Sequence, residues 1–369
     1  MVRARPVATA FTLLLVVTTG VAAQSAPRFG TGVTWQRFAF ATPAAADIDA
    51  LSLMTVPLAG ELALGDRLVL RLSGAWARAL LIRADGSEST LAGFTDTEAS
   101  AHIEIVPGMA ALTAIAALPT GKRTLTHDEM FVAGAIAADL LPFAITNWGS
   151  GGGAGVALAL TRPLGRYAAG IRAGWVIARS YSPLTDDAFE YRPGDQLHLR
   201  AAIDRVIGRS AKVALQAGWQ HFGADRGDER NLFQSGDRWQ VVGTVNFALR
   251  SASALVYAGW LDRGEGEFAE PIELLPAQQL FYAGAGLRTL AGGIALQPSL
   301  DLRLLQSDGA DRTGWVLGVG SSFEFAGGGT IWAPTGRARF GRIEARAGDT
   351  SGFTGVELGL AARFGAEAR

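Results

Sequence analysis

The sequence predicts an all-β protein, an antiparallel transmembrane barrel of about 16 strands, from three observations. The chain opens with a segment typical of an export signal. No later segment offers the roughly 20 continuous apolar residues that a membrane-spanning helix needs. Its strand-like runs alternate apolar and polar residues. Because only helices and closed barrels satisfy every backbone N–H and C=O group in hydrocarbon, an exported apolar chain made of strands is expected to close into a barrel.

The N-terminal residues have the three parts of a secretory signal. Arg3 and Arg5 precede a largely apolar stretch at residues 7–21, and the small residues Ala22 and Ala23 follow it. We therefore predict a signal peptide at residues 1–23 and a single barrel domain at residues 24–369, located in the bacterial outer membrane. A lone uncleaved membrane anchor is the alternative interpretation.

The final strand-like run, residues 356–364, shows the alternation most clearly. Apolar residues occupy its even positions from Val356 to Phe364, and small or charged residues occupy the odd positions between Gly355 and Arg363. One face therefore suits lipid and the other suits water. An alternating strand that ends in an aromatic residue resembles the closing strand of bacterial outer-membrane barrels, although residues 365–369 extend beyond it.

Composition narrows the class of function. Hydrophobic residues make up 49% of the chain and charged residues 18%, with 47 glycines and no cysteine. This composition is more apolar than expected for an exported soluble protein that has no disulfide bonds to stabilise it. A net charge of −1 argues against a broad surface for nucleic acid, which needs clustered Lys and Arg.

From residue 153 onward, strand-like runs are joined alternately by short and longer connections, as expected for periplasmic turns and extracellular loops. The short connections lie at residues 164–166, 208–211, 250–251, 291–293 and 326–329, and the longer ones at 181–193, 225–236, 264–277, 306–312 and 346–352. A soluble β-sandwich would also alternate apolar and polar faces. Tryptophans near the strand ends favour the aromatic girdles of a membrane barrel instead: Trp175, Trp219, Trp239, Trp260 and Trp315.

A helix interrupts the strands. Five strands are expected near residues 29–41, 49–58, 66–80, 95–106 and 109–119. Thr126 and Glu129 then fit a capping box, a helix-forming run reaches residue 141, and Pro142 stops it. Five strands before this helix and eleven after it give 16, with 14 as the second choice, whereas counting residues 131–141 as a strand gives an odd number. The helix near residues 126–141, in an insertion at 124–150, is apolar nearly all round and is expected inside the barrel or across its mouth.

Two short motifs carry a family resemblance. Gly93-Phe94-Thr95-Asp96 opens one strand region, and Leu118-Pro119-Thr120-Gly121-Lys122 ends another. Together they resemble the outer-membrane transporter family related to the phenol meta-pathway and long-chain fatty-acid transport barrels. The resemblance implies uptake of small hydrophobic or aromatic molecules. The fatty-acid transporters of this family have an N-terminal plug, whereas the first expected strand here begins soon after the predicted cleavage site.

The residues expected to face the lumen carry charges of both signs. The candidates for a solute path are Arg71, Glu98, His102, Glu104, Arg172, His198, Arg200, Arg238, Arg303, Arg337 and Arg339. Such a wall fits a polar interior, and its alternative role is structural, as ion pairs that satisfy one another or hold the helix. The candidate gate residues on the helix are Met130, Phe131, Ile136 and Leu140.

Signals for other chemistry are weak. The glycine run at residues 149–155 lacks the Lys-Ser/Thr step of a phosphate-binding loop, and neither His102 nor His198 lies in a serine nucleophile motif. We therefore predict no enzyme activity, cofactor or metal. The sequence favours a channel or transporter for passive uptake of small solutes, hydrophobic or aromatic ones among them. Its expected partners are that solute, outer-membrane lipid and the barrel-assembly machinery. A structural or surface-binding barrel without transport is the alternative, and an outer-membrane hydrolase is the third choice.

Overall fold

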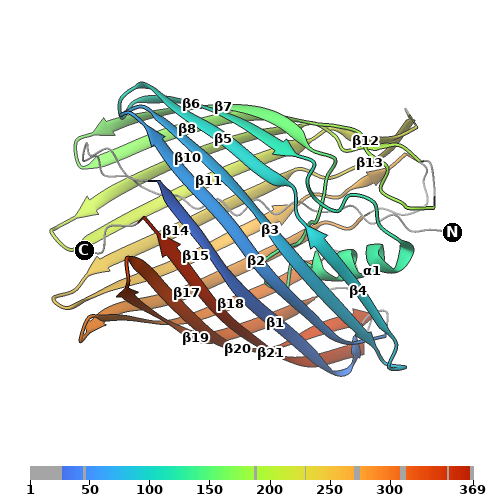
Figure 1. The fold of residues 1–369 in the computed structure, drawn as a ribbon. Coiled ribbons are helices and arrows are strands. Elements are labelled where there is room, and N and C mark those ends of the chain that lie inside the picture. Colours follow the sequence, from blue (N-terminus) through green and yellow to red (C-terminus); the bar gives the residue numbers. More distant parts are fainter. Residues whose placement is uncertain are drawn as a thin grey trace.

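The computed structural model describes residues 27–44, 47–186, 189–228, 230–269, 275–307, 313–346 and 349–365, so the predicted signal peptide lies outside the described residues. The described chain forms a closed antiparallel barrel of 16 strands (Figure 1). The first strand, β1 (Arg28–Ala44), pairs with the last, β21 (Asp349–Phe364), in a continuous register from Phe29 opposite Phe364 to Phe40 opposite Phe353. This pairing closes the wall and leaves no free edge between the first and last strands.

The other strands of the wall follow one another in chain order. They are β2 (Ile48–Leu64), β3 (Leu68–Arg83), β4 (Glu88–Phe94), β5 (Thr97–Val106), β6 (Ala110–Leu118), β7 (Gly153–Leu164), β8 (Tyr167–Ala178), β10 (Gln196–Ile207), β11 (Ala211–Phe222), β14 (Arg238–Ala248), β15 (Ala252–Arg263), β17 (Gln278–Ala291), β18 (Ile294–Ser307), β19 (Gly314–Gly327) and β20 (Thr330–Arg346). Both β4 and β5 pair with β3, so they occupy one strand position that is interrupted at Thr95 and Asp96. The predicted barrel, its strand count and its helix are confirmed.

The strand boundaries differ from the prediction where the chain bends. The strand expected at residues 95–106 corresponds to β5 alone, and β4 was not predicted. Strands β1, β2 and β3 also run further than expected, to Ala44, Leu64 and Arg83. The added residues of β1 and β3 extend the ladder toward the end of the barrel with the longer connections, and those of β2 extend it toward the end with the short turns.

A second, smaller sheet forms among the longer connections, which were expected to be loops. It contains β9 (Tyr191–Arg192), β12 (Ala224–Gly227), β13 (Arg230–Gln234) and β16 (Glu267–Phe268). The Tyr191 hydroxyl donates to Asp225 Oδ2 at 2.5 Å, and the Gly194 N–H donates to Asp225 Oδ1 at 2.7 Å. Burial raises the pKa of the Asp225 carboxyl, and these two hydrogen bonds oppose that rise. Strands of two to five residues are too short to leave a clear periodic signal in the sequence.

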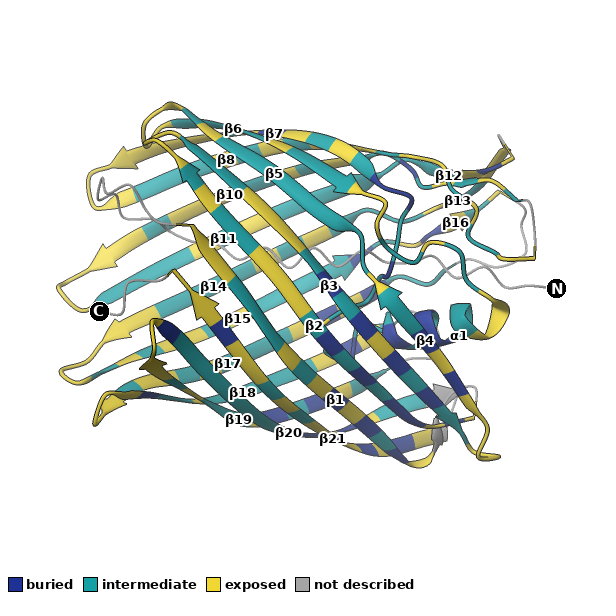
Figure 2. Cartoon of the chain, in the orientation of Figure 1, coloured by how far each residue is buried: buried dark blue, intermediate teal, exposed yellow. Residues whose placement is uncertain are grey.

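The outer face of the wall is apolar. On β10, Leu197, Leu199 and Ile203 are exposed, whereas His198 and Arg200 between them face the lumen and are half-buried. A similar alternation of exposed and more buried residues runs along parts of other strands, such as β8 and β21 (Figure 2). A closed barrel with large exposed apolar side chains outside is suited to lipid rather than water, as expected of a transmembrane barrel.

The helix α1 (His127–Ile136) begins as predicted and ends earlier. The Thr126 hydroxyl accepts from the Glu129 N–H at 3.3 Å, and Glu129 Oε2 accepts from the Thr126 N–H at 3.1 Å, which completes the capping box. The helix was expected to reach residue 141, but it ends at Ile136 with Ala137 as its C-cap. The following residues turn instead, and Asp139 reaches an arginine on the wall. Among the described residues, no helix has the length and hydropathy needed to cross a bilayer.

Candidate functional site

The insertion between β6 and β7 packs against the inner face of the wall. Val132, Ala133 and Ile136 of α1 are buried in one apolar cluster with residues of β1 to β4. The wall residues of this cluster include Phe38, Leu53, Ala77, Ala79, Leu81 and Leu91. In this part of the barrel most lumen-facing side chains are therefore apolar, because the insertion covers them. Burying an apolar helix in this way stabilises it by roughly 25 cal/mol for each Å² removed from water.

The insertion continues past α1 and reaches other sectors of the wall. The Phe143 ring meets the Phe38 ring of β1 edge-on, with centroids 5.0 Å apart. Gln36 Nε2 donates to the Pro142 carbonyl at 2.9 Å, and the Ala144 N–H donates to Gln36 Oε1 at 2.8 Å. Gly314 of β19 has no room for a side chain, because a Cβ atom there would lie 2.6 Å from Leu140 Cδ2. The insertion thus contacts β1 and β19 as well as β3 and β4, and so it narrows the lumen.

Asp96, at the break between β4 and β5, holds both ends of the insertion. Its Oδ1 accepts from the Gly121 N–H at 3.1 Å, and its Oδ2 accepts from the Ser150 N–H and hydroxyl, each at 2.7 Å. Lys122 pairs with Glu129 of α1. The two motifs that carry the family resemblance therefore meet in space, and in this chain they anchor the insertion.

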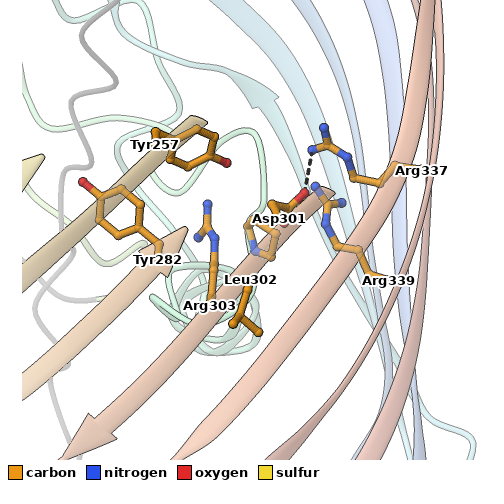
Figure 3. Close-up of a pocket in the computed structure, with 8 residues that line it drawn as sticks. Tyr257, Tyr282, Asp301, Leu302, Arg303, Arg337 and Arg339 are labelled. Carbon is orange, nitrogen blue, oxygen red and sulfur yellow. Dashed lines mark ion pairs between the residues drawn. The ribbon is translucent and has the colours of Figure 1, made fainter. Parts of the chain in front are cut away.

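A pocket of about 240 Å³ lies beside the insertion, on the lumenal face of strands β15 to β20 (Figure 3). It is lined by Pro142, Tyr257, Tyr282, Asp301, Leu302, Arg303, Arg337 and Arg339. Pro142 belongs to the insertion, and the other residues come from the wall. The pocket therefore lies where the insertion and the wall approach each other.

Positive charge dominates the lining of this pocket. Its three arginines face a single lining carboxylate, Asp301, whose Oδ1 lies 3.5 Å from Arg337 Nη1. Arg339 Nη1 lies 2.6 Å from Glu357 Oε2 of β21, and Arg303 Nη1 donates to the backbone carbonyl of Asp139 at 3.4 Å. Asp301 and Glu357 neutralise two of these three guanidinium groups, so the pocket keeps an excess of one positive charge.

Two tyrosines form the apolar side of the pocket. Their ring centroids are 6.5 Å apart, and Gln240 Nε2 donates to the Tyr282 hydroxyl at 2.8 Å. Each ring lies over a glycine of the neighbouring strand: a Cβ atom on Gly284 would lie 2.4 Å from Tyr257 Cζ, and one on Gly259 would lie 2.3 Å from Tyr282 Cζ. These glycines let both rings lie flat against the wall, which leaves the space in front of them open.

The structure brings part of the predicted solute path to this region. Arg303, Arg337 and Arg339 line the pocket, and Arg238 lies opposite Arg263 in the β14–β15 register. Arg263 in turn approaches Asp139 of the insertion, with Nη1 and Oδ2 3.7 Å apart. The other predicted residues lie on a different sector of the wall, on β3, β5, β8 and β10: Arg71, Glu98, His102, Glu104, Arg172, His198 and Arg200.

Some of those remaining residues have local partners. Arg71 Nε donates to Glu61 Oε2 at 2.9 Å, and His102 Nδ1 lies 3.1 Å from the Thr113 hydroxyl. Among the hydrogen bonds of the described chain, none joins His102 or His198 to a serine, which is the contact that a hydrolase of the predicted kind would need. The described residues contain no group of three His, Cys, Asp or Glu side chains placed to hold a metal ion.

Three of the four candidate gate residues pack the insertion against the wall. Ile136 and Leu140 are fully buried in the apolar cluster. Phe131 packs beside that cluster, with the Arg83 guanidinium carbon 5.2 Å from its ring centroid, and Met130 is half-buried. None of the four lines the pocket. Leu140 also lies beyond the end of α1 rather than on it.

Sequence reasoning missed the two tyrosines, Asp139 and Arg263. Tyr257 and Tyr282 occupy positions in the alternation of their strands that face the lumen, and this alternation could have identified them. Asp139 lies in residues that were expected to be helical and apolar, and its role depends on the early end of α1.

No protein-family model matches the chain, and no curated protein matches its sequence. Among solved structures, an anion-selective porin from Comamonas acidovorans is 14% identical, with 92% of this chain and 99% of that chain covered and a TM-score of 0.44. The outer-membrane channel DcaP of Acinetobacter baumannii is 9% identical over 92% and 97% of the two chains, with a TM-score of 0.44. A triple mutant of the Rhodopseudomonas blastica porin is 11% identical over 92% and 100%, with a TM-score of 0.42. These are distant likenesses, and neither the choice of solute nor the family resemblance follows from them.

Proposed function

We propose that this protein is a passive outer-membrane channel for small solutes, and that it favours anions with an aromatic or apolar part. The observation that carries the proposal is the pocket beside the insertion, where three arginines and two tyrosines line the narrowed lumen. An unobstructed lumen alone would not select among small solutes. A constriction that presents both charged groups and aromatic ring faces would select among them.

The charge of the lining supports anion preference. Arg337 pairs with Asp301 and Arg339 with Glu357, so Arg303 supplies the excess positive charge of the lining. Channels lined by one sign of charge with low-dielectric walls concentrate ions of the opposite sign. Arginine also binds carboxylates and phosphates through paired N–H groups, so the pocket suits planar anionic groups in particular.

The size and the rings of the pocket support small aromatic solutes. Its volume of about 240 Å³ is below the range of about 300 to 1,000 Å³ that holds drug-sized ligands. The faces of Tyr257 and Tyr282 offer an apolar surface on which a single ring can stack. A one-ring carboxylate such as benzoate has both features. The hydrophobic or aromatic solutes implied by the family resemblance agree with this assignment.

A structural barrel closed to solutes is the second candidate. The apolar cluster that joins α1, Leu140 and Phe143 to several sectors of the wall favours it, because the cluster fills part of the lumen. The two candidates differ in one property, which is ion flow through the inserted protein.

Planar bilayers containing the purified protein test the proposal. Under a potassium chloride gradient, the reversal potential of the wild type should show preference for chloride. In an Arg303→Gln/Arg337→Gln variant this preference should fall or vanish, and benzoate should block chloride current less. Arg288→Gln is the matched control, because Arg288 is exposed and pairs with Glu324 away from the pocket. Absence of current through the correctly folded wild type would favour the structural role, and equal ion preference in all three proteins would exclude the pocket as the selective element.

A further inference from the structure

Two arginines interrupt the apolar outer face of the wall on β1 and β3. Arg37 and Arg78 are both exposed. Their neighbours in the chain, Gln36 and Phe38 in one case and Ala77 and Ala79 in the other, are buried toward the lumen. Arg37 lies opposite the exposed Val356 of β21. Both guanidinium groups therefore point out of the barrel.

Their height along the wall places them at one boundary of the lipid. Arg37 is eight residues from Phe29, an exposed aromatic residue at the end of the barrel with the short turns. At about 3.3 Å per residue and a tilt of about 40°, this separation is roughly 20 Å along the membrane normal. Arg78 is ten residues from the start of β3, or roughly 25 Å by the same rise and tilt. The apolar band of such barrels is about 25 Å tall, so both arginines lie at its edge on the side of the longer connections.

The two arginines also lie close enough to share a ligand. On β2, which separates them, Arg37 is opposite Ser52 and Arg78 is opposite Met54. Two strand spacings and two residues place their Cα atoms roughly 12 Å apart. A long side chain from each position can therefore reach the space over β2.

No protein group in the described part of the chain satisfies these charges. None of its ion pairs involves Arg37 or Arg78. The outward carboxylates nearest in register are Asp49, three residues along β2 from Ser52, and Glu88, which lies opposite Ile82, four residues along β3 from Arg78. No ion pair of the described chain joins either of them to Arg37 or Arg78. A cation on the lipid face costs little only near the interface, where an anionic headgroup can meet it.

We propose that Arg37 and Arg78 bind a phosphate of lipid A, the phosphorylated glycolipid of the outer leaflet. The longer connections of outer-membrane barrels lie outside the cell, which puts both residues in that leaflet. Guanidinium groups pair with phosphate through two parallel hydrogen bonds, and basic sites on membrane proteins bind lipid headgroups in this way. Trp35 and Met54 lie beside them on the same outer face and would contact the acyl chains. This site is outside the lumen, so it does not depend on the proposed channel function.

Native mass spectrometry of the full chain, refolded in detergent without lipid, tests the site. The protein is titrated with bisphosphorylated lipid A, dephosphorylated lipid A or phosphatidylglycerol. We expect the wild type to bind the bisphosphorylated lipid most tightly. An Arg37→Gln/Arg78→Gln variant should bind it about 30-fold more weakly, or about fivefold for each arginine. Arg205→Gln is the control, since Arg205 lies over the Tyr167 ring at the opposite boundary, near the short turns, and it should keep the wild-type affinity.

Three outcomes would overturn the proposal. Equal affinity of the double variant and the wild type for bisphosphorylated lipid A would show that the arginines do not bind it. Equal binding of the two lipid A forms by the wild type would show that the phosphate is not recognised, and this comparison can be made even if the double variant does not fold. Binding of phosphatidylglycerol as tightly as lipid A would show a general preference for anionic lipid.

Discussion

Asp96 accepts two hydrogen bonds from Ser150, one from the backbone N–H and one from the hydroxyl, each at 2.7 Å. These two residues are 54 positions apart in the sequence, and they close the insertion onto the break between β4 and β5. The contact explains why one strand position of the barrel is split. At this position the wall carries a carboxylate that fixes the segment inside the lumen.

Replacement of Asp96 should therefore loosen the insertion without opening the barrel. In Asp96→Asn the hydrogen bonds to a charged acceptor, each contributing about 1.5 to 3 kcal/mol, are weakened. Single-channel recordings should then show noisier current with excursions to larger conductance, while heat-modifiable migration on gels stays as in the wild type. Asp204→Asn is the matched control, because Asp204 pairs with Lys212 on the wall, away from the insertion. The same steady current from both variants would contradict this role of Asp96.

The two faces of β10 predict opposite effects for adjacent residues. Leu199 is exposed to lipid, so Leu199→Arg should impair insertion into the membrane by about 2 to 4 kcal/mol if it lies near the midplane. Arg200 faces the lumen, so Arg200→Leu should insert normally and change conductance alone. The folded fraction on unboiled gels measures both. Similar insertion defects in the two variants would mean that the assignment of faces is wrong.

The small sheet outside the barrel predicts a pH effect. Burial raises the pKa of Asp225, and the Tyr191 hydroxyl opposes the rise by donating to the ionised form. A carboxyl whose pKa is raised on folding contributes stability below its unfolded pKa, and that contribution is lost as pH rises through the folded value. Tyr191→Phe removes the opposing hydrogen bond and should raise the pKa further. Carbon-13 NMR titration of Asp225 would measure this, and a lower pKa in the variant would contradict the assignment.

The local parts of this structure could be predicted from the sequence, and the parts that depend on register could not. Thr126 and Glu129 predict the start of the helix, because a capping box depends only on four consecutive residues. The alternation in β10 is local too, because successive residues of a strand point to opposite faces, and it therefore assigns Leu199 and Arg200 to opposite faces. Which residues of different strands share a height depends on the stagger of the whole barrel, so Tyr257, Tyr282 and Arg303 could not be placed in one pocket.

The early end of α1 follows from a long-range contact. Residues 137–141 have a composition that suits a helix, but Asp139 turns toward Arg263 and Leu140 packs on β19. Tertiary contacts of this kind outweigh helix propensities, which amount to less than about 1 kcal/mol per residue. The break at Thr95 and Asp96 also involves long-range contacts, because the Asp96 carboxylate accepts hydrogen bonds from Gly121 and Ser150 of the insertion.

Single-channel conductance of a barrel without its insertion tests the central claim most directly. Residues 126–150 are replaced by a short Gly/Ser linker, and the protein is refolded and checked for heat-modifiable migration. If the insertion narrows a path for solutes, the deleted barrel should conduct more than the wild type and lose its preference among ions and for benzoate. Unchanged conductance and unchanged solute preference in the correctly inserted deletion would show that the insertion does not limit the path, and would favour a structural role for the barrel.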